Sequence, residues 1–409
     1  MTTPTAAATL PRWKSVLFWI ILATIVLGTL ELAATWYLKL FEGYDGKHLL
    51  QYEFDPYKNV LPTRNYVDTR GIHHNSQGFR RLSDVPVEKP ANTYRIFLMG
   101  GSTAYGTGSL FTRIQREFAV VPDSATIAAI LERELAESLP NMRVEVINAA
   151  ISSTWTHHHL IYLNQTILRY NPDLVLFLDG FNDFYFYEKG HDQFADYTYQ
   201  EHSHVIMGDP TLYSLAYMDG WWLFRKSAFA NVATRALRSL KWRLASRERR
   251  PIDVQESLAG LKEVFPRSAL KMQRRVGLIL RDEGVGAVFM LQPMLILERG
   301  RKPMPPIEQQ LFDYDVGYWA PNYEAFMQQA VPYVRVREEA MARDVGAHFI
   351  DLTGIYAGIP EQVYTDYCHL TPAGNTLLAR YVEQRIAPWI RADVARKSAA
   401  GRRPPQPSR

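Results

Sequence analysis

One serine and one histidine–aspartate pair have the residue types and the spacing that nucleophilic catalysis needs. Ser102 follows two glycines at the end of an apolar run, within the segment LMGGSTAYG, and His369 lies three residues after Asp366 in the segment DYCH. A serine hydroxyl becomes a good nucleophile when a base removes its proton, and imidazole is such a base when a carboxylate holds its other ring nitrogen. A single turn could therefore supply both the base and its orienting carboxylate.

Taken alone, the glycine segment fits a nucleophile, a phosphate-binding loop or a plain turn. Gly101 and Gly106 have the glycine spacing of a P-loop, but Thr107 stands where that motif needs a lysine. The Gly-x-Ser-x-Gly nucleophile elbow also fails, because Ala104 occupies the place of its second glycine. A serine after a strand is often only a helix cap, so the interpretation as a nucleophile depends on His369.

The elements that must position these residues alternate along the chain. Short apolar runs rich in Val, Ile and Phe predict strands that are buried on both faces of a parallel sheet. These runs cover residues 94–99, 143–147, 173–179, 285–292 and 347–352. Helical patterns lie between and after them, at about 123–135, 154–170, 267–283, 322–344 and 372–390. The alternation predicts an α/β fold, with a doubly wound, mostly parallel five-stranded sheet flanked by helices.

Ligands of doubly wound sheets bind at the carboxyl ends of the strands, so the residues just after each strand should gather at one edge. Several of these residues are polar or small. Gly101 and Ser102 follow the first strand, Ala150 the second, Asn182 and Asp183 the third, and Asp366 and His369 lie beyond the last.

These blocks resemble the SGNH/GDSL hydrolases, a family of serine esterases with a flavodoxin-like fold. The resemblance covers roughly residues 94–390 outside an insertion and uses Gly101-Ser102, Gly180-Phe181-Asn182-Asp183 and Asp366-Tyr367-Cys368-His369. The first block reads Gly-Gly-Ser-Thr here instead of the usual Gly-Asp-Ser. The resemblance implies that Ser102 is the nucleophile, that His369 is the general base and acid, and that Asp366 orients His369.

The resemblance also implies an oxyanion hole formed by the backbone N–H of Ser102, the side-chain amide of Asn182 and a backbone N–H after the second strand. The family has a glycine at this last position, where the aligned residue is Ala150. Alanine keeps the N–H but would be strained if the site required a positive φ. Gly101 and Asp183 are further candidates for the site. Asp183 and Asp179 could orient the oxyanion loop or only cap the strand end.

The sequence predicts neither a cofactor nor a metal. The adjacent histidines at 157–159 point in different directions on a helix, and no carboxylate stands at the spacing of a metal-binding helix. Cys368 is the single cysteine, which excludes an intramolecular disulfide, and we expect it to be a small packing residue. Arg80, in the segment 75–80, could bind an anionic substrate or belong to a structural turn.

The N-terminal region predicts a membrane anchor. Residues 15–38 are apolar apart from three threonines and Glu31, and they are long enough to cross a bilayer. Arg12 and Lys14 precede them, which favours a cytoplasmic N-terminus, and no small-residue cleavage site follows. We therefore expect residues 1–14 in the cytoplasm and an uncleaved anchor. The rest of the chain should be periplasmic or extracellular.

The remaining chain predicts a lead-in over 39–90, a hydrolase-like domain over 91–392 and a disordered basic tail over 393–409. An insertion at about 184–267 interrupts the domain. Its segment from 235 to 250 contains seven Arg or Lys residues and one Glu, with leucines at helical spacing. This segment could be an ordinary solvated helix, or it could contact anionic lipid headgroups or an acidic polymer.

A net charge of +4 over 409 residues does not suggest a nucleic-acid partner. The sequence predicts a membrane-anchored serine ester hydrolase that removes acyl groups such as acetyl from a carbohydrate or lipid of the cell envelope. Two alternatives stay open. The same triad could transfer the acyl group to a polysaccharide, or the chain could be a catalytically silent scaffold that keeps the fold.

Overall fold

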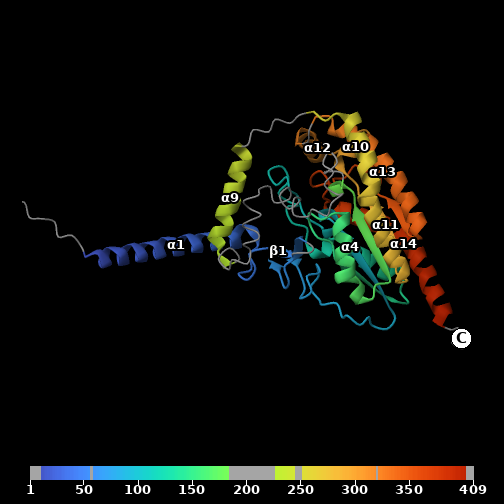
Figure 1. Ribbon diagram of the computed structural model, residues 1–409, viewed down its shortest axis with the longest axis horizontal. Helices are drawn as coiled ribbons and strands as arrows, with labels where there is room; N and C mark the ends of the chain where they lie inside the picture. The colour runs from blue at the N-terminus through green and yellow to red at the C-terminus, as the bar shows by residue number, and fades with distance from the viewer. Residues whose placement is uncertain (1–10, 56–58, 184–225, 245–250, 319–320, 402–409) are drawn as a thin grey trace, which may run out of the picture.

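The chain folds into an α/β body that carries a long N-terminal helix and a small layer of β-structure between the two (Figure 1). The computed structural model describes residues 11–55, 59–183, 226–244, 251–318 and 321–401. Most of the predicted insertion, at 184–225 and 245–250, therefore lies outside the described residues.

A five-stranded parallel sheet forms the centre of the body, as the alternation of apolar runs predicts. Its strands are β5 (Thr93–Gly100), β6 (Arg143–Asn148), β7 (Leu174–Asp179), β8 (Gly286–Leu291) and β9 (His348–Asp351). They lie in the order β6-β5-β7-β8-β9, and every pair is parallel. This is the flavodoxin-like strand order, which confirms the doubly wound fold.

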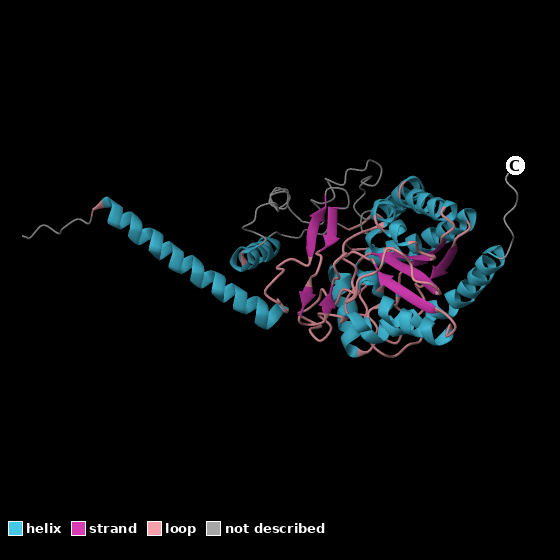
Figure 2. Ribbon diagram, turned by 90° about the horizontal axis from the view of Figure 1, so that it is seen from below, coloured by secondary structure: helices cyan, strands magenta, loops and turns pink. Residues whose placement is uncertain are grey.

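Helices cover both faces of the sheet (Figure 2). The helices of the body are α3 (Ile127–Ser138), α4 (Thr156–Gln165), α10 (Val254–Arg267), α11 (Ala269–Asp282), α12 (Pro306–Tyr318), α13 (Tyr323–Val345) and α14 (Pro372–Gly401). Short helical turns lie at α2 (Ser102–Tyr105), η1 (Asp123–Ala125), η2 (Ile167–Tyr170) and η4 (Leu295–Leu297). The five predicted helices correspond to α3, α4 with η2, α11, α13 and α14.

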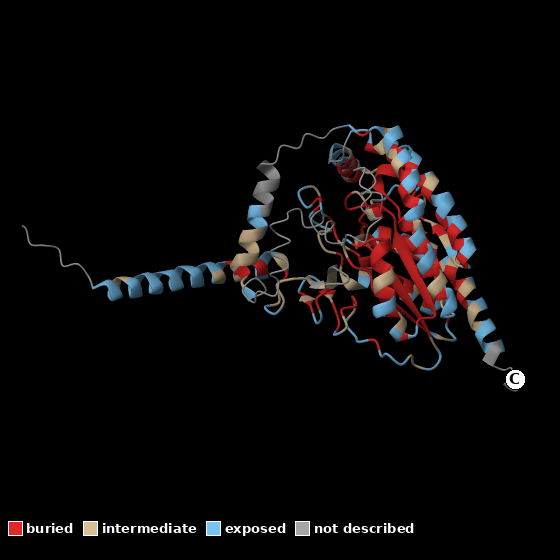
Figure 3. Ribbon diagram, in the orientation of Figure 1, coloured by how far each residue is buried: buried red, intermediate tan, exposed pale blue. Residues whose placement is uncertain are grey.

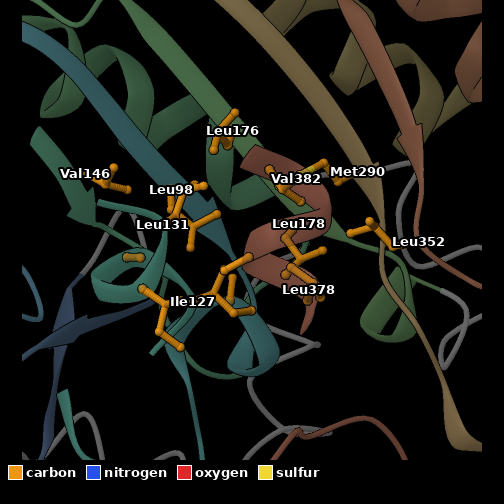
Figure 4. Close-up of a cluster of buried hydrophobic side chains, with 14 of the residues drawn as sticks. Leu98, Ile127, Leu131, Val146, Leu176, Leu178, Met290, Leu352, Leu378 and Val382 are labelled. Carbon is orange, nitrogen blue, oxygen red and sulfur yellow. The ribbon is translucent and has the colours of Figure 1, made fainter. Parts of the chain in front are cut away.

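The period of two in the strands divides the core into two layers. On one face, Leu98, Leu176 and Met290 pack against Leu131 of α3 and Leu378 of α14 (Figure 4). On the other face, phenylalanines of neighbouring strands meet side chains of α4, α11 and α13. That layer includes Phe97, Phe177, Phe289, Leu163, Val276 and Met341. Every residue of β7 is buried, as expected for the central strand of such a sheet.

The sequence pattern missed α10, which falls inside the predicted insertion. Its residues Leu258, Leu261 and Phe265 are buried with Phe326 and Met327 of α13. The end of the insertion therefore packs against the body, because α10 presents apolar residues on one face, at i, i+3 and i+7.

The predicted basic tail differs from the structure. Helix α14 continues to Gly401, so residues 393–401 are helical and only 402–409 lie outside the described residues. Within this extension Asp393 pairs with Arg396 at 2.6 Å and with Lys397 at 2.9 Å. Lys397 also pairs with Asp173 at 2.9 Å, next to the start of β7. These pairs at helical spacing, together with the contact to Asp173, support a helix in a segment whose composition predicted disorder.

The lead-in contains two small antiparallel sheets instead of a purely irregular linker. Strand β1 (Tyr52–Asp55) pairs with β2 (Asn59–Pro62), and β3 (Val67–Asp68) pairs with β4 (Ile72–His73). They lie between the N-terminal helix and the body (Figure 2).

The N-terminal helix α1 (Arg12–Glu42) has 31 residues. Among the described residues it is the one helix that is long and apolar enough to cross a membrane. Its surface is exposed over almost its whole length, in contrast to the buried sheet (Figure 3). The last part of α1 contacts α9 (Ala228–Leu244), a helix from the region of the predicted insertion.

Close packing at the end of β5 gives a first prediction. Gly100 has a φ of 149°, and a Cβ there would lie 2.3 Å from the backbone oxygen of Leu178 on β7. Gly100→Ala should lower the free energy of unfolding by about 2–5 kcal/mol, because both the backbone conformation and the space exclude a side chain. Thermal melts of the detergent-solubilised chain would measure the loss.

Gly260→Ala is the matched control, because nothing lies within 4 Å of a Cβ at this position in α10. Alanine should stabilise this helix by about 0.5–1 kcal/mol. Equal effects of the two substitutions would contradict the packing described for Gly100.

Candidate active site

The turn after β5 presents Ser102 at the start of α2. A Cβ on Gly101 would lie 2.7 Å from Nδ2 of Asn182 and 3.0 Å from the backbone oxygen of Thr154. The turn therefore has no room for a side chain at 101, and Asn182 is brought directly against it. Ser102 is partly exposed, whereas Thr103 and Ala104 are buried. Only the serine of this short helix is thus open to a reactant.

Arg80 holds the far end of this turn. Its Nη1 donates to the backbone oxygens of Tyr105 at 2.8 Å and Gly106 at 2.9 Å, and its Nε donates to Asp123 at 2.9 Å. Its Nη2 donates to the backbone oxygen of Val121, and its guanidinium lies 4.5 Å above the ring of Tyr105. These contacts engage all three nitrogens of the buried guanidinium. Arg80 therefore belongs to a structural turn, which was the alternative to binding an anionic substrate.

The lead-in also contacts, through Tyr105, the turn that carries Ser102. The Tyr105 hydroxyl lies 2.6 Å from Nε2 of Gln51 and 2.7 Å from Nε2 of His74. Nδ1 of His74 lies 3.0 Å from the backbone oxygen of Thr63, so Nδ1 carries the proton and Nε2 accepts from Tyr105. Burial lowers the pKa of His74 to about 4, which keeps the ring neutral. The lead-in therefore fixes α2, the short helix that carries Ser102.

The second turn contains the histidine–aspartate pair. Nδ1 of His369 lies 2.8 Å from Oδ2 and 2.9 Å from Oδ1 of Asp366, and both side chains are buried. The carboxylate also accepts from the backbone N–H groups of His369 at 2.9 Å, Cys368 at 3.1 Å and Leu110 at 2.8 Å. Burial acts to raise the pKa of Asp366, but His369 and these hydrogen bonds lower it below its ordinary value.

The ionised carboxylate fixes the state of the imidazole. Because an ionised carboxylate only accepts hydrogen bonds, Nδ1 of His369 carries the ring proton. Nε2 is then an acceptor, and it is a buried atom with no hydrogen-bond partner among the described residues. A buried acceptor without a partner costs free energy, so it marks a place where another group is expected to bind.

Hydrogen bonds hold the two turns together. The Thr103 hydroxyl donates to the backbone oxygen of Cys368 at 3.1 Å, which joins the residues next to Ser102 and His369. Ser109 donates to the backbone oxygen of Thr365 at 2.8 Å. With the bond from Leu110 to Asp366, these contacts place the segment after β5 directly against the turn of the predicted base.

Two groups proposed for the oxyanion hole have other partners in this structure. The N–H of Ala150 donates to Oδ1 of Asn148 at 3.2 Å, and Nδ2 of Asn182 donates to the backbone oxygen of Thr154 at 2.6 Å. Ala150 does not have a positive φ, so the strain that alanine would suffer in that conformation does not arise there. Asn182 keeps a second N–H for a reactant.

The loop between β6 and α4 contains Ser153, a residue that the sequence analysis did not single out. It has a φ of 63°, a left-handed conformation that glycine adopts more readily, and it is exposed. The hydroxyls of its neighbour Ser152 and of Thr107 lie 2.7 Å apart, which joins this loop to the segment that follows Ser102. The run Ser152-Ser153-Thr154 was the available signal, because small polar residues are common in such turns.

A buried acidic group, Asp179 and Asp183, lies at and just after the end of β7, on either side of Asn182 in the sequence. Nε2 of His159 lies 2.8 Å from Asp179, and the Thr156 hydroxyl donates to Asp183 at 3.2 Å. Burial first, and then the neighbouring Asp179, raise the pKa of Asp183 well above its ordinary value. Asp179 and Asp183 therefore join the end of β7 to α4. His159 pairs with a carboxylate there.

Among the described residues, only Asp366, Cys368 and His369 bring three possible metal-ligand atoms within 4.8 Å of one another. Burial raises the pKa of the Cys368 thiol well above its ordinary value, so this sulfur is a protonated and poor ligand. Asp366 is already occupied by His369 and by backbone N–H groups. This donor set suits an oriented imidazole better than a metal ion.

No protein-family model matches the chain, and no curated protein matches it. Among solved structures it is similar to the acetylxylan esterase Axe2 of Geobacillus stearothermophilus, with 13% identity and a TM-score of 0.38 over 72% of this chain and 94% of that one. It is also similar to a protein described as a GDSL-like lipase from Parabacteroides merdae, with 11% identity and a TM-score of 0.36 over 70% and 92% of the two chains. Both TM-scores are below 0.5, so the fold is assigned from the strand order and the site from the side chains of this chain.

The contacts of Arg80 with the turn that carries Ser102 give a second prediction. Arg80→Lys removes the planar fork that binds three backbone oxygens and Asp123, and it should lower the free energy of unfolding by about 2–4 kcal/mol. Arg81→Lys is the neighbouring control, because the one hydrogen bond of the Arg81 side chain to the described residues is an exposed contact with Ser83 at 3.1 Å. This substitution should change stability by less than about 0.5 kcal/mol. Thermal melts would compare the two, and equal losses would contradict the role of Arg80.

The acidic group gives a third prediction, on pH. Burial raises the pKa of Glu338 on α13 to about 8, with Gln273 donating to it at 2.6 Å and Asp179 adding repulsion. An acid with a raised folded pKa binds more protons when the chain is folded. The contribution of Glu338 to the free energy of unfolding is therefore fully present below about pH 4.5 and is lost as the pH rises to about 8. Glu338→Gln should remove this loss.

Melting temperatures at pH 5 and pH 8 would measure the effect. The Glu338→Gln chain should gain stability over the wild type at pH 8 relative to pH 5. Glu339→Gln, at the exposed neighbouring position, should show no such gain. The prediction would be contradicted if the melting temperature of Glu338→Gln changed between pH 5 and pH 8 as much as that of the wild type.

Proposed function

We propose that this chain is a serine ester hydrolase of the SGNH type, anchored in a membrane by α1. The proposal depends above all on one observation, the buried His369 that is oriented by Asp366 and keeps Nε2 without a partner among the described residues. The bond from Thr103 to Cys368 supports the pairing of this base with Ser102.

The reaction begins when a substrate carbonyl lies against Ser102. The Ser102 oxygen attacks the carbonyl carbon and its proton passes to Nε2 of His369, while the carbonyl π electrons move to the oxygen. Asp366 stabilises the resulting imidazolium through Nδ1–H. The carbonyl then re-forms and the bond to the alcohol oxygen breaks, while His369 gives its proton to that oxygen, which leaves the acyl group on Ser102. Water repeats the sequence on the acyl-enzyme, which releases the acid and restores Ser102.

The negative oxygen of the intermediate requires donors that point at it before the reaction. We assign this role to the backbone N–H of Ser102 and to an N–H of Asn182, whose amide lies against the turn at Gly101. Ala150 would contribute only if its N–H left Asn148. One such donor is worth about 10²- to 10³-fold in kcat in serine hydrolases.

The anchor suggests where the substrate lies. Arg12 and Lys14 precede the apolar part of α1, which favours a cytoplasmic N-terminus and a body in the periplasm or outside the cell. A tethered enzyme of this kind meets esters in the cell envelope. We propose an acylated carbohydrate or lipid as the substrate, with acetyl as the acyl group to test first.

The mechanism gives the fourth prediction. Ser102→Ala should lower kcat for a generic acetyl ester by at least about 10³-fold, and Asp366→Asn by about 10⁴-fold because the imidazole loses its tautomer. Ser138→Ala, at the end of α3, is the control and should keep full activity. Initial rates of the purified full chain would measure this, with melting temperatures to show that each variant folds.

The outcomes separate the alternatives. Full activity of Ser102→Ala would contradict the mechanism. Activity of the wild type that yields acylated sugar, instead of free acid, when an acceptor sugar is present would identify a transferase with the same triad. A wild type that is inactive on esters and is not acylated at Ser102 would indicate a silent scaffold.

A further inference from the structure

An acidic residue of the membrane helix caps a second helix. Glu31 of α1 accepts hydrogen bonds from the Ser227 hydroxyl at 2.7 Å and from the backbone N–H groups of Ala228 at 2.5 Å and Phe229 at 3.0 Å. The first N–H groups of a helix have no partner within it, and they favour a negative charge. Glu31 supplies both an acceptor and the charge to the first turn of α9.

Further contacts along α9 support this docking. Arg235 forms two hydrogen bonds to Glu42, at 2.6 and 3.0 Å. Ala34 and Leu38 of α1 are buried together with Ala228. Two helices joined by a cap, a bidentate ion pair and an apolar contact form a defined unit. The acid in the apolar span therefore has a structural role that is independent of the catalytic site.

The direction of α9 relative to α1 is informative. Figure 1 shows α9 running across the C-terminal end of α1, and the turned view of Figure 2 shows α9 end-on beside the same part of α1. If α1 spans a bilayer, a helix that crosses it in this way lies in the plane of the membrane.

The sequence of α1 indicates the depth. Trp36 and Tyr37 are exposed on α1, at the level where aromatic residues mark the headgroup region. Glu31 precedes Trp36 by five residues, which is about 7.5 Å along the axis at 1.5 Å per residue. Amphipathic interfacial helices lie about 5–10 Å into the boundary between headgroups and acyl chains. The first turn of α9 falls within this range.

The composition of α9 fits such a place. Leu237 is 67% exposed, and Leu240 and Leu244 follow it at helical spacing in the sequence. Arg238, Lys241 and Arg243 lie between and beside these leucines, and the segment 235–250 continues with three more arginines. An exposed leucine in a segment with a high density of basic residues is typical of helices that bind anionic membranes.

We propose that α9 is a membrane-surface helix that binds anionic phospholipid headgroups of the outer leaflet and is fixed to the anchor by Glu31. The proposal depends on the membrane anchoring given above, but not on the esterase activity. The paired helices would hold the catalytic body at a set height and orientation over the bilayer. The lead-in follows α1 in the chain, and its residues Gln51 and His74 contact Tyr105 of α2, the helix that carries Ser102.

A spin label tests the position of α9. The full chain with Leu237→Cys and Cys368→Ser would carry a nitroxide, and it would be reconstituted in nanodiscs of phosphatidylcholine alone or with 30% phosphatidylglycerol. We expect the label to be more accessible to oxygen than to a water-soluble nickel chelate, with the larger difference in the anionic discs. A label at Val336→Cys on the exposed face of α13 should be accessible to the chelate in both.

Charge variants test the lipid. Arg238→Glu, Lys241→Glu and Arg243→Glu together should abolish the difference between anionic and neutral discs. A matched triple on exposed residues of the body, Lys271→Glu, Arg281→Glu and Arg343→Glu, should leave it unchanged. Glu31→Ala should make the label at 237 more mobile and more accessible to the chelate, whereas Glu88→Ala on the exposed lead-in should not.

Each result decides part of the proposal. A label at 237 that the chelate reaches in both kinds of disc would overturn a membrane-surface helix. Equal burial of the label in both discs, or an unaffected basic triple, would overturn the preference for anionic headgroups. A chain that does not insert α1 into the disc would overturn the anchor together with this proposal. None of these readouts uses ester hydrolysis, so they can fail while the proposed activity stands.

Discussion

The carboxylate of Asp366 is the group on which the arrangement of the candidate site depends. It is fully buried, and a charge in such a place is tolerated only when hydrogen bonds and an opposite or polar partner compensate for the lost water. Asp366 obtains that compensation from the ring of His369, from two N–H groups of its own turn and from Leu110. The same contacts set the tautomer of His369 and tie its turn to the segment after Ser102. The same hydrogen bonds of Asp366 therefore orient the imidazole of His369 and hold the candidate site together.

A second constraint comes from the sheet. Parallel strands end at one edge, so the residues after β5, β6 and β7 meet although they are far apart in the sequence. The edge is crowded, since Gly100 faces the backbone of β7 and Gly101 faces Asn182 and Thr154. A side chain at either position would push these segments apart. The two glycines are thus explained by the approach of neighbouring backbones, and Ser102 is the first residue whose side chain has space.

The sequence was sufficient for the central sheet, because each buried strand is a short apolar run and each run is followed by a turn. It also brought out Ser102, Asp366 and His369, whose types and spacing carry chemical meaning. It did not reveal that Arg80 binds backbone oxygens, that the N–H of Ala150 meets Asn148, or that Ser153 has a positive φ. These features depend on backbone atoms of distant segments, which leave no local pattern. The continuation of α14 was missed for a related reason, because Lys397 pairs with Asp173 more than two hundred residues away.

The central claim is that Ser102 is a nucleophile activated by His369. Incubation of the purified full chain with a fluorophosphonate, followed by peptide mass spectrometry, tests it most directly, because the probe reacts with an activated serine and needs no knowledge of the substrate. The account predicts a single covalent adduct on the peptide that contains Ser102, lost in Ser102→Ala and strongly slowed in Asp366→Asn. An unmodified Ser102 in folded wild-type protein, or the same adduct on another serine, would contradict it.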